Sequence, residues 1–221
     1  PQGGGLPPQP APSAVDEDLR GRLRHAAERA IKKFPRRSSP GPNGSRFEHW
    51  GALAHDDEAL QAGAEYVVDF LLGDCPVEAL RANLGARLMA LKKPTGGIRP
   101  LALGSVVRRL AAKAAGAALK SRLSEAVGPF QYGVGRKAGC ELVHKCVTAL
   151  TDDDLTRVVI AFDVSNAFGT LPRQAIWDGV CARLPELATT AGAWLGAPTG
   201  HMYLDDQGGV RPVSASLGVD Q

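Results

Sequence analysis

The middle of the chain contains a long stretch without acidic residues, between Glu78 and Glu125. Its basic residues are Arg81, Arg87, Lys92, Lys93, Arg99, Arg108, Arg109, Lys113, Lys120 and Arg122. Leu, Ala and Val recur between them at the spacing of a packed core, which indicates a folded segment and not a charged tail. A folded, uniformly basic element favours a polyanionic partner, either nucleic acid or nucleotide phosphate, over a solvated surface.

Length and composition indicate a globular protein of one large or two small domains. The chain has 221 residues, of which 44% are hydrophobic and 22% are charged, and both fractions are typical of packed domains. No apolar run approaches the length of a membrane span. The four cysteines include no C-x-x-C pair, which favours reduced thiols in an intracellular protein, nuclear or cytoplasmic. Because the chain starts with Pro1, we expect it to be incomplete.

Clusters of Gly and Pro divide the chain into expected elements. Residues 1–14 are rich in Pro and Gly and are expected to be disordered. Apolar periodicity predicts helices at 15–34, across 46–72 and 76–91, and at 106–127, 140–150, 172–184 and 185–195. Turn residues predict one hairpin around Gly96 and Gly97, with a strand ending near Leu91, and a second hairpin around 206–209.

An apolar run at 157–163 ends in Asp163 and predicts a strand buried on both faces. A carboxylate at the end of a buried strand is costly unless a cation meets it. Mg²⁺ at polymerase-type sites is held by one or two carboxylates together with substrate phosphates, and the carbonyl of Val164 could share the coordination. The alternative is that Asp163 or Ser165 caps a short turn ending at Pro172. Spacing alone leaves both interpretations open.

Several motifs, in order along the chain, resemble those of reverse transcriptases of non-LTR retrotransposons. The segments are SPGPNG at 39–44, LKKPTGGIRPLALGSVVRRLAAKAAGAALKSRL at 91–123, FQYGVGRKAGCELVHKCVTAL at 130–150, FDVSNAFGTLPR at 162–173 and GVDQ at 218–221. In the same order, they are similar to five elements of the family. These are its Gly-Pro-Asp-Gly element, its fingers hairpin with the following helix, its Gln-x-Gly-Phe element, its first catalytic motif and the opening of its Gly-Val-x-Gln-Gly-Asp-Pro motif. Asn43 stands where the family usually has Asp. Each motif alone is weak, and their common order makes the match specific.

The resemblance implies roles for the residues around the first catalytic motif. Asp163 would be a catalytic aspartate that binds Mg²⁺, or alternatively Mn²⁺, and Val164 would lend a backbone carbonyl to the metal. Phe168 would be the aromatic residue under the sugar that excludes a 2′-hydroxyl, with plain core packing as the alternative. Gln221 would line the nucleotide pocket near the templating base.

The resemblance also implies roles for the basic stretch. Lys92, Lys93 and Arg99 would bind the triphosphate of the incoming nucleotide, because Arg is a fork-shaped phosphate donor and Lys is a mobile point charge. The alternative for these residues is an ordinary solvated hairpin. In the following helix, Arg108, Arg109 and Lys113 would contact template phosphates or solvent.

The sequence Tyr203-Leu204-Asp205-Asp206 resembles the Tyr-x-Asp-Asp box that supplies the family's remaining catalytic aspartates. In the family that box follows the Gly-Val-x-Gln motif, whereas here it precedes Gly218. We therefore interpret it as part of an ordinary hairpin turn.

The expected fold is α/β (α+β) in the manner of right-hand polymerases. Helical fingers would occupy 15–150 and the N-terminal part of the palm 151–221, ending before the second catalytic aspartate motif. The implied function is RNA-directed DNA synthesis, in which deoxynucleotides are added to a primer 3′ end by two-metal phosphoryl transfer, with this fragment alone inactive. The implied partners are an RNA template, a DNA primer and dNTPs, with no membrane, and the oligomeric state stays open. Alternatives are an inactive nucleic-acid-binding remnant, another palm-type polymerase, and a group II intron-like reverse transcriptase.

Overall fold

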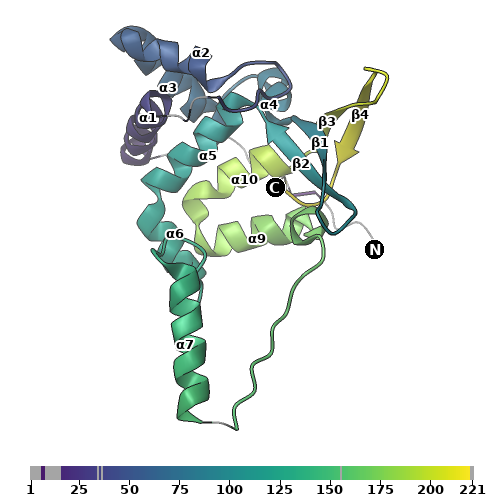
Figure 1. Cartoon of the computed structure of the whole chain (residues 1–221). Coiled ribbons are helices and arrows are strands. Elements are labelled where there is room, and N and C mark those ends of the chain that lie inside the picture. The colour runs from purple at the N-terminus through teal and green to yellow at the C-terminus, as the bar shows by residue number, and fades with distance from the viewer. Residues whose placement is uncertain (1–5, 8–15, 34, 36, 155, 220–221) are drawn as a thin grey trace. The chain divides into compact units, whose positions relative to one another are not determined.

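The computed structural model describes residues 6–7, 16–33, 35, 37–154 and 156–219. The chain divides into two compact units (Figure 1): a larger one of Pro1–Ala118 with Ala167–Gln221, and a smaller one of Leu119–Asn166. The disorder expected at 1–14 falls outside the described residues, apart from Leu6 and Pro7. None of the described helices has the length and apolar character needed to cross a membrane.

Helices form most of the larger unit. Its central helices α1 (Glu17–Lys32), α3 (Asp57–Leu72) and α5 (Val106–Ala118) pack against one another. The other helical elements are α2 (Phe47–Gly51), η1 (Ala52–His55), α4 (Val77–Leu84), α8 (Ala167–Thr170), α9 (Arg173–Arg183), η2 (Pro185–Leu187) and α10 (Ala188–Leu195). The core of the unit is mainly aliphatic, with Phe47 and Phe70 as buried aromatic residues, in line with the low aromatic content of 5%.

Local signals in the sequence explain where the central helices begin and end. The Asp16 carboxylate accepts a hydrogen bond from the Asp18 amide at 3.1 Å, and the Asp56 carboxylate accepts one from the Ala59 amide at 2.8 Å. Both satisfy amides of a first helical turn. Gly73 ends α3 in the left-handed conformation, with a φ of 76°. The helix expected to reach residue 91 ends at Leu84, because the next strand begins already at Ala86.

The two predicted hairpins are confirmed, and they join into one sheet. β1 (Ala86–Lys92) pairs with β2 (Ile98–Gly104), and β3 (Thr199–Leu204) pairs with β4 (Val210–Ala215), both antiparallel. A parallel pairing of β1 with β3 gives the four-stranded order β2-β1-β3-β4. The buried His201 stabilises the pairing of β1 with β3, because its Nδ1 accepts a hydrogen bond from the Ala86 amide at 3.2 Å.

The loop that carries the SPGPNG motif packs directly against the end of β2. A Cβ at the buried Gly41 would lie 2.7 Å from the Gly104 carbonyl oxygen and 2.8 Å from the Ser105 Cα, so only glycine fits there. The Asn43 side chain accepts hydrogen bonds from the Ser45 amide at 3.1 Å and from the Ser45 hydroxyl at 2.8 Å, which closes the turn. The motif therefore has a structural role in positioning the hairpin.

The smaller unit contains α6 (Lys120–Val127), α7 (Gly139–Asp153) and a long segment without regular structure.

The helix expected at 106–127 begins where it was predicted to begin. Ser105 caps α5 as expected, since its hydroxyl accepts a hydrogen bond from the Arg108 amide at 3.1 Å. The single helix expected at 106–127 is however two, because it breaks at Leu119. Among the described residues of the smaller unit, only Leu119 is buried.

The strand predicted at 157–163 is wrong. Residues 157–164 adopt no regular structure, and the side chains of Val158 and Phe162 are 82% and 90% exposed. The apolar run signalled a buried strand, but a strand exists only where a neighbour satisfies its backbone groups. The strands of the described sheet all belong to the other unit.

We predict that Gly41→Ala destabilises the protein by about 1–3 kcal/mol. The added methyl group would clash with backbone atoms, which cannot rotate away as a side chain could. Denaturant unfolding measures this change. Gly21→Ala in α1 is the matched control, since its Cβ would meet nothing within 4 Å, and it should stabilise the helix by up to about 1 kcal/mol. Equal effects of the two substitutions would contradict the close packing of the loop.

Candidate functional site

Two motifs that lie far apart in the sequence meet in the larger unit. The Val219 amide donates a hydrogen bond to the Phe168 carbonyl at 2.9 Å, and the Gly218 amide donates one to the Leu171 carbonyl at 2.8 Å. Gly218 has a φ of 68°, and a Cβ on it would lie 2.3 Å from the Phe168 oxygen. The segment carrying Gly218 and Val219 therefore docks closely onto α8, the helix that contains Phe168.

A buried arginine holds this junction in position. The Arg173 guanidinium donates hydrogen bonds to the Gly218 carbonyl at 3.1 Å, to the Ala197 carbonyl at 2.7 Å and to the Thr199 hydroxyl at 3.0 Å. Its residue is only 4% exposed, and a buried cation is tolerated only when its donors are satisfied. Sequence reasoning missed Arg173; the only available signal was an Arg directly after the Leu-Pro pair of the first catalytic motif.

The Phe168 side chain is not part of the core. It is 52% exposed, although its backbone is fixed by the contact with Val219. The core-packing alternative is thus not supported, and the ring is available to a ligand. Gln221, the other residue assigned to the nucleotide pocket, lies outside the described residues.

Asp163 and Val164 lie in the smaller unit, on the segment that was expected to be a strand. Both residues are exposed, with Val164 at 67%. The part of the chain that the structure describes contains no cluster of three or more His, Cys, Asp or Glu side chains able to hold a metal ion. Asp163 with the Val164 carbonyl does not make up a two-metal site, which needs further carboxylates.

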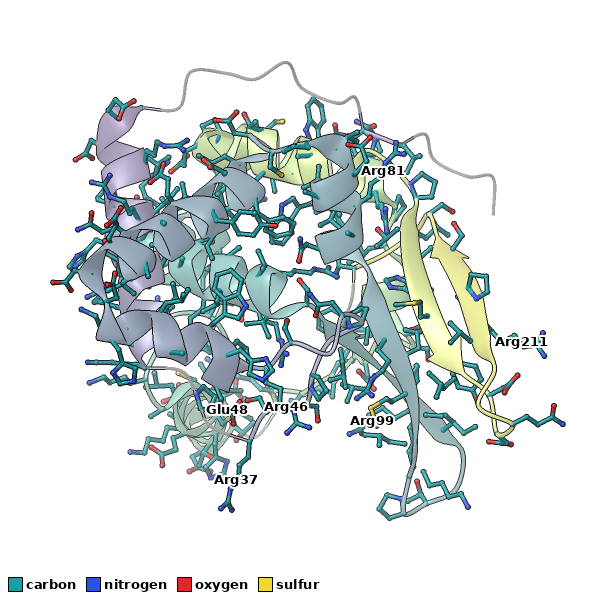
Figure 2. All side chains as sticks on the ribbon, turned by 90° about the horizontal axis from the view of Figure 1, so that it is seen from above. Arg37, Arg46, Glu48, Arg81, Arg99 and Arg211 are labelled. Carbon is teal, nitrogen blue, oxygen red and sulfur yellow. The ribbon has the colours of Figure 1, made fainter. Side chains whose placement is uncertain are left out.

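The cationic side chains of the hairpin of β1 and β2 are exposed to solvent. Lys92, Lys93 and Arg99 are all exposed near its tip, and Figure 2 labels Arg99 on this hairpin. In the register Arg99 pairs with Leu91, and Lys92 pairs with Ile98. Since neighbouring strand residues point to opposite faces, Lys92 and Arg99 extend from opposite faces of the hairpin. The expected shared contact with one triphosphate therefore requires the long side chains to reach around the tip.

The arginines at the start of α5 form hydrogen bonds and aromatic contacts within the protein. Arg108 donates to the Leu84 carbonyl at 2.9 Å and lies 5.8 Å from the Trp194 ring centroid. Arg109 donates to the Ser39 carbonyl at 2.9 Å and lies 4.4 Å from the Phe47 ring centroid.

Burial lowers the pKa of Arg109 below its ordinary value. Its contact with Ser39 ties α5 to the SPGPNG loop. Of the three residues expected to contact the template, Lys113 is the exposed one.

Asp205 stabilises the hairpin of β3 and β4. Its carboxylate accepts hydrogen bonds from Arg211 Nε at 2.9 Å, from the Gly209 amide at 2.7 Å and from the Gln207 amide at 3.1 Å. The Arg211 hydrogen bond, followed by that of the Gly209 amide, lowers the pKa of Asp205. These contacts agree with our interpretation of Tyr203–Asp206 as a hairpin turn.

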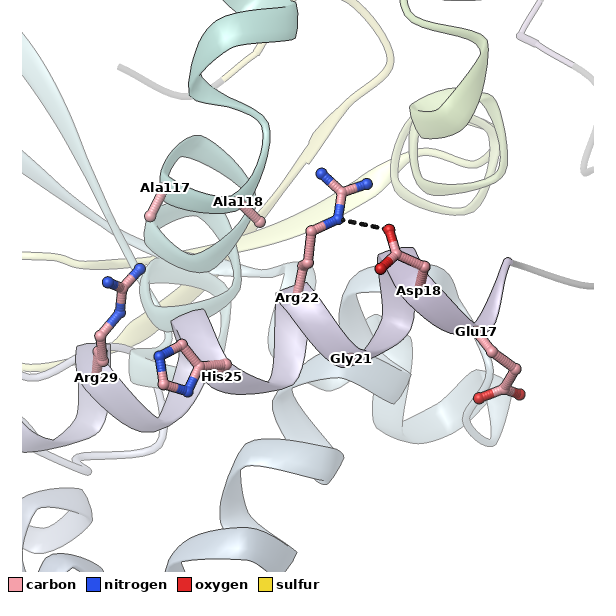
Figure 3. A pocket seen from close by; sticks show the side chains of 8 residues that line it. All are labelled: Glu17, Asp18, Gly21, Arg22, His25, Arg29, Ala117 and Ala118. Atoms are coloured by element: carbon pink, nitrogen blue, oxygen red, sulfur yellow. Dashed lines mark ion pairs between the residues drawn. The ribbon is translucent and has the colours of Figure 1, made fainter.

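A surface groove of about 590 Å³ lies between α1 and α5 (Figure 3). Its lining residues are Glu17, Asp18, Gly21, Arg22, His25, Arg29, Ala117 and Ala118. Arg22 pairs with Asp18 at 3.0 Å, and the acidic and basic side chains largely offset one another. The groove contains none of the residues that the sequence analysis assigned to a site.

We predict that Gly218→Ala releases the segment at 218–219 from α8, because the new Cβ collides with the Phe168 carbonyl and a left-handed φ is unfavourable for Ala. Amide hydrogen exchange at Val219 should lose about 1–3 kcal/mol of protection. Gly208→Ala is the control, since Gly208 has a similar φ of 79° but open space around it. Unchanged exchange at Val219 in Gly218→Ala would refute the docking.

We predict that Asp205→Asn lowers the free energy of unfolding at neutral pH, because the charge on Asp205 strengthens its hydrogen bonds. A carboxyl group with a lowered folded-state pKa stabilises above its unfolded pKa of about 3.9 and loses this contribution as the pH falls through its folded-state pKa. The difference in unfolding free energy between wild type and variant should therefore shrink below about pH 4. Asp206→Asn, which removes none of these contacts, should match wild type. A difference independent of pH would exclude the charge as the cause.

Comparison with known proteins gives one distant relationship. The chain is 26% identical over 175 residues to the retrotransposable element SLACS 132 kDa protein of Trypanosoma brucei gambiense. The match covers 79% of this chain and 14% of that protein, so the chain spans about a seventh of its relative's length. No family model matches the chain. The chain is thus distantly similar to a retrotransposon protein.

Proposed function

We propose that this chain is the fingers and N-terminal palm of a retrotransposon reverse transcriptase. The whole protein would copy an RNA template from a DNA primer using dNTPs. The observation that carries the proposal is the docking of Gly218 and Val219 onto α8, beside the exposed Phe168. The two motifs that meet there are those that the resemblance assigns to one nucleotide pocket.

The chemistry of these residues supports a deoxynucleotide as ligand. The Val219 amide fixes the Phe168 backbone, so an exposed aromatic ring attached there would discriminate against a 2′-hydroxyl by direct contact. The exposed cations of the β1–β2 hairpin supply charge for a triphosphate. The four strands contain no acidic residue, so the sheet does not repel a polyanion.

The distant retrotransposon relative supports the class of parent protein. Asp163 would contribute one carboxylate to the Mg²⁺ or Mn²⁺ chemistry of such an enzyme, and the other carboxylates would have to come from outside the described residues. DNA synthesis is accordingly proposed for the longer protein and not for this chain alone.

A second candidate function is binding of nucleic acid without synthesis. It is favoured by the absence of a metal-binding cluster from the described residues and by the exposure of Asp163. Such a remnant would keep the basic stretch and lose activity. Template affinity that falls with salt fits both candidates, so binding does not separate them.

The separating experiment is primer extension on an RNA template by the full-length protein that carries this chain. Asp163→Asn should lower the rate at least about 1000-fold, because a neutral amide replaces a metal-binding carboxylate. Template affinity should stay within about two-fold, because Asp163 does not contact template phosphates.

Asp206→Asn is the matched control, since it removes an exposed aspartate from the Tyr-x-Asp-Asp sequence. It should retain nearly full activity. Loss of extension in Asp206→Asn with retention in Asp163→Asn would reverse the assignment of the catalytic aspartate. No extension by the unaltered protein would favour the binding remnant.

A further inference from the structure

Gly218 is bound through both its amide and its carbonyl by residues that directly follow α8. Its amide donates a hydrogen bond to the Leu171 carbonyl at 2.8 Å, and its carbonyl accepts one from the Arg173 guanidinium at 3.1 Å. The Val219 amide adds a third hydrogen bond, to the Phe168 carbonyl at 2.9 Å. Of these three contacts, only that of Arg173 comes from a side chain. A substitution at position 173 therefore loosens the docked segment and leaves the backbone groups of the other two contacts chemically unchanged.

Arg173 makes its contact with Gly218 from a well-anchored position. It is 4% exposed, and it also donates hydrogen bonds to the Ala197 carbonyl at 2.7 Å and to the Thr199 hydroxyl at 3.0 Å. Thr199 is itself buried and begins β3, which pairs with β4 along its whole length. One planar group thus ties the chain before β3 to the chain after β4. Lysine lacks this planar fork and cannot make the same set of contacts.

We propose that Arg173 is a positioning residue that sets the sugar selectivity at Phe168. This inference rests on the proposed function, in which the Phe168 ring contacts the sugar of the nucleotide. Arg173 keeps the segment at 218–219 against α8, and the Val219 hydrogen bond fixes the backbone from which the exposed Phe168 ring extends.

The proposal predicts an asymmetric effect on the two kinds of nucleotide. A displacement of about 1 Å at a reacting site can change a rate by about 100-fold. A ring that can move away no longer excludes a 2′-hydroxyl, whereas a deoxynucleotide has no hydroxyl to exclude. Loss of Arg173 should therefore reduce discrimination more than it reduces DNA synthesis.

Amide hydrogen exchange on this chain tests the positioning step without any polymerase activity. Arg173→Ala should speed exchange at the Val219 amide at least about ten-fold, because local opening of the segment becomes easier. Arg20→Ala is the matched control, since Arg20 bonds Glu65 at 2.8 Å between α1 and α3, away from this junction. It should leave exchange at Val219 within about two-fold. Unchanged exchange in Arg173→Ala would overturn the positioning role.

Primer extension by the full-length protein that carries this chain tests the selectivity. The ratio of kcat/KM for a deoxynucleotide to kcat/KM for the matching ribonucleotide should fall about ten-fold in Arg173→Ala. A smaller fall is expected in Arg173→Lys, which keeps the charge and loses the fork. Arg20→Ala should leave the ratio unchanged, because a loss of folded protein lowers both rates equally. If Arg173→Ala does not fold, the ratio in Arg173→Lys decides.

Added guanidinium chloride, at a concentration that does not unfold the protein, tests the chemistry of the missing group. The ion can enter the space left in Arg173→Ala and bind the same acceptors, so it should restore the ratio, whereas methylammonium chloride should not. Guanidinium otherwise weakens folded proteins, so recovery has the opposite sign to denaturation. An unchanged ratio in an active variant would overturn this role alone. Absence of extension by the unaltered protein would overturn the proposed function and the sugar selectivity with it, while exchange at Val219 would still decide whether Arg173 positions the segment.

Discussion

The buried guanidinium of Arg173 connects three segments, and the docking of Gly218 onto α8 depends on it. Its donors bind the Ala197 carbonyl and the Thr199 hydroxyl, where β3 begins, and the Gly218 carbonyl, where the chain leaves β4. An arginine this deeply buried is tolerated only while its acceptors stay in place. The position of the segment carrying Gly218 is therefore coupled to the hairpin that precedes it, and the hairpin is coupled to the helical core through β1.

The SPGPNG loop is likewise held by a few close contacts, at the β2 edge of the sheet. Gly41 allows close backbone approach to Gly104, and Arg109 reaches back to the Ser39 carbonyl. Residues that resemblance assigns to a functional motif thus fix the hairpin that bears the phosphate-binding candidates. Arg108 and Arg109 were expected to contact template, yet in the structure they hold backbone carbonyls of their own unit.

Local features of the fold could be predicted from the sequence, and long-range ones could not. The cap at Asp16, the glycine at the end of α3 and the Gly96-Gly97 turn each act within a few residues, so their signals are readable. The parallel pairing of β1 with β3 and the docking of Gly218 on α8 depend on partners far along the chain. The strand at 157–163 failed for the same reason, because its apolar pattern specifies burial but cannot supply a neighbouring strand.

We propose that Phe168 and the segment at 218–219 line one deoxynucleotide pocket. Photoaffinity labelling tests it most directly, with the protein bound to primer and template and a deoxynucleoside triphosphate carrying a photoreactive base. We expect adducts in the peptides containing Phe168 and Val219, and an unlabelled deoxynucleotide should prevent their formation better than a ribonucleotide does. Adducts confined to other surfaces, such as the groove between α1 and α5, or equal protection by both sugars, would contradict it.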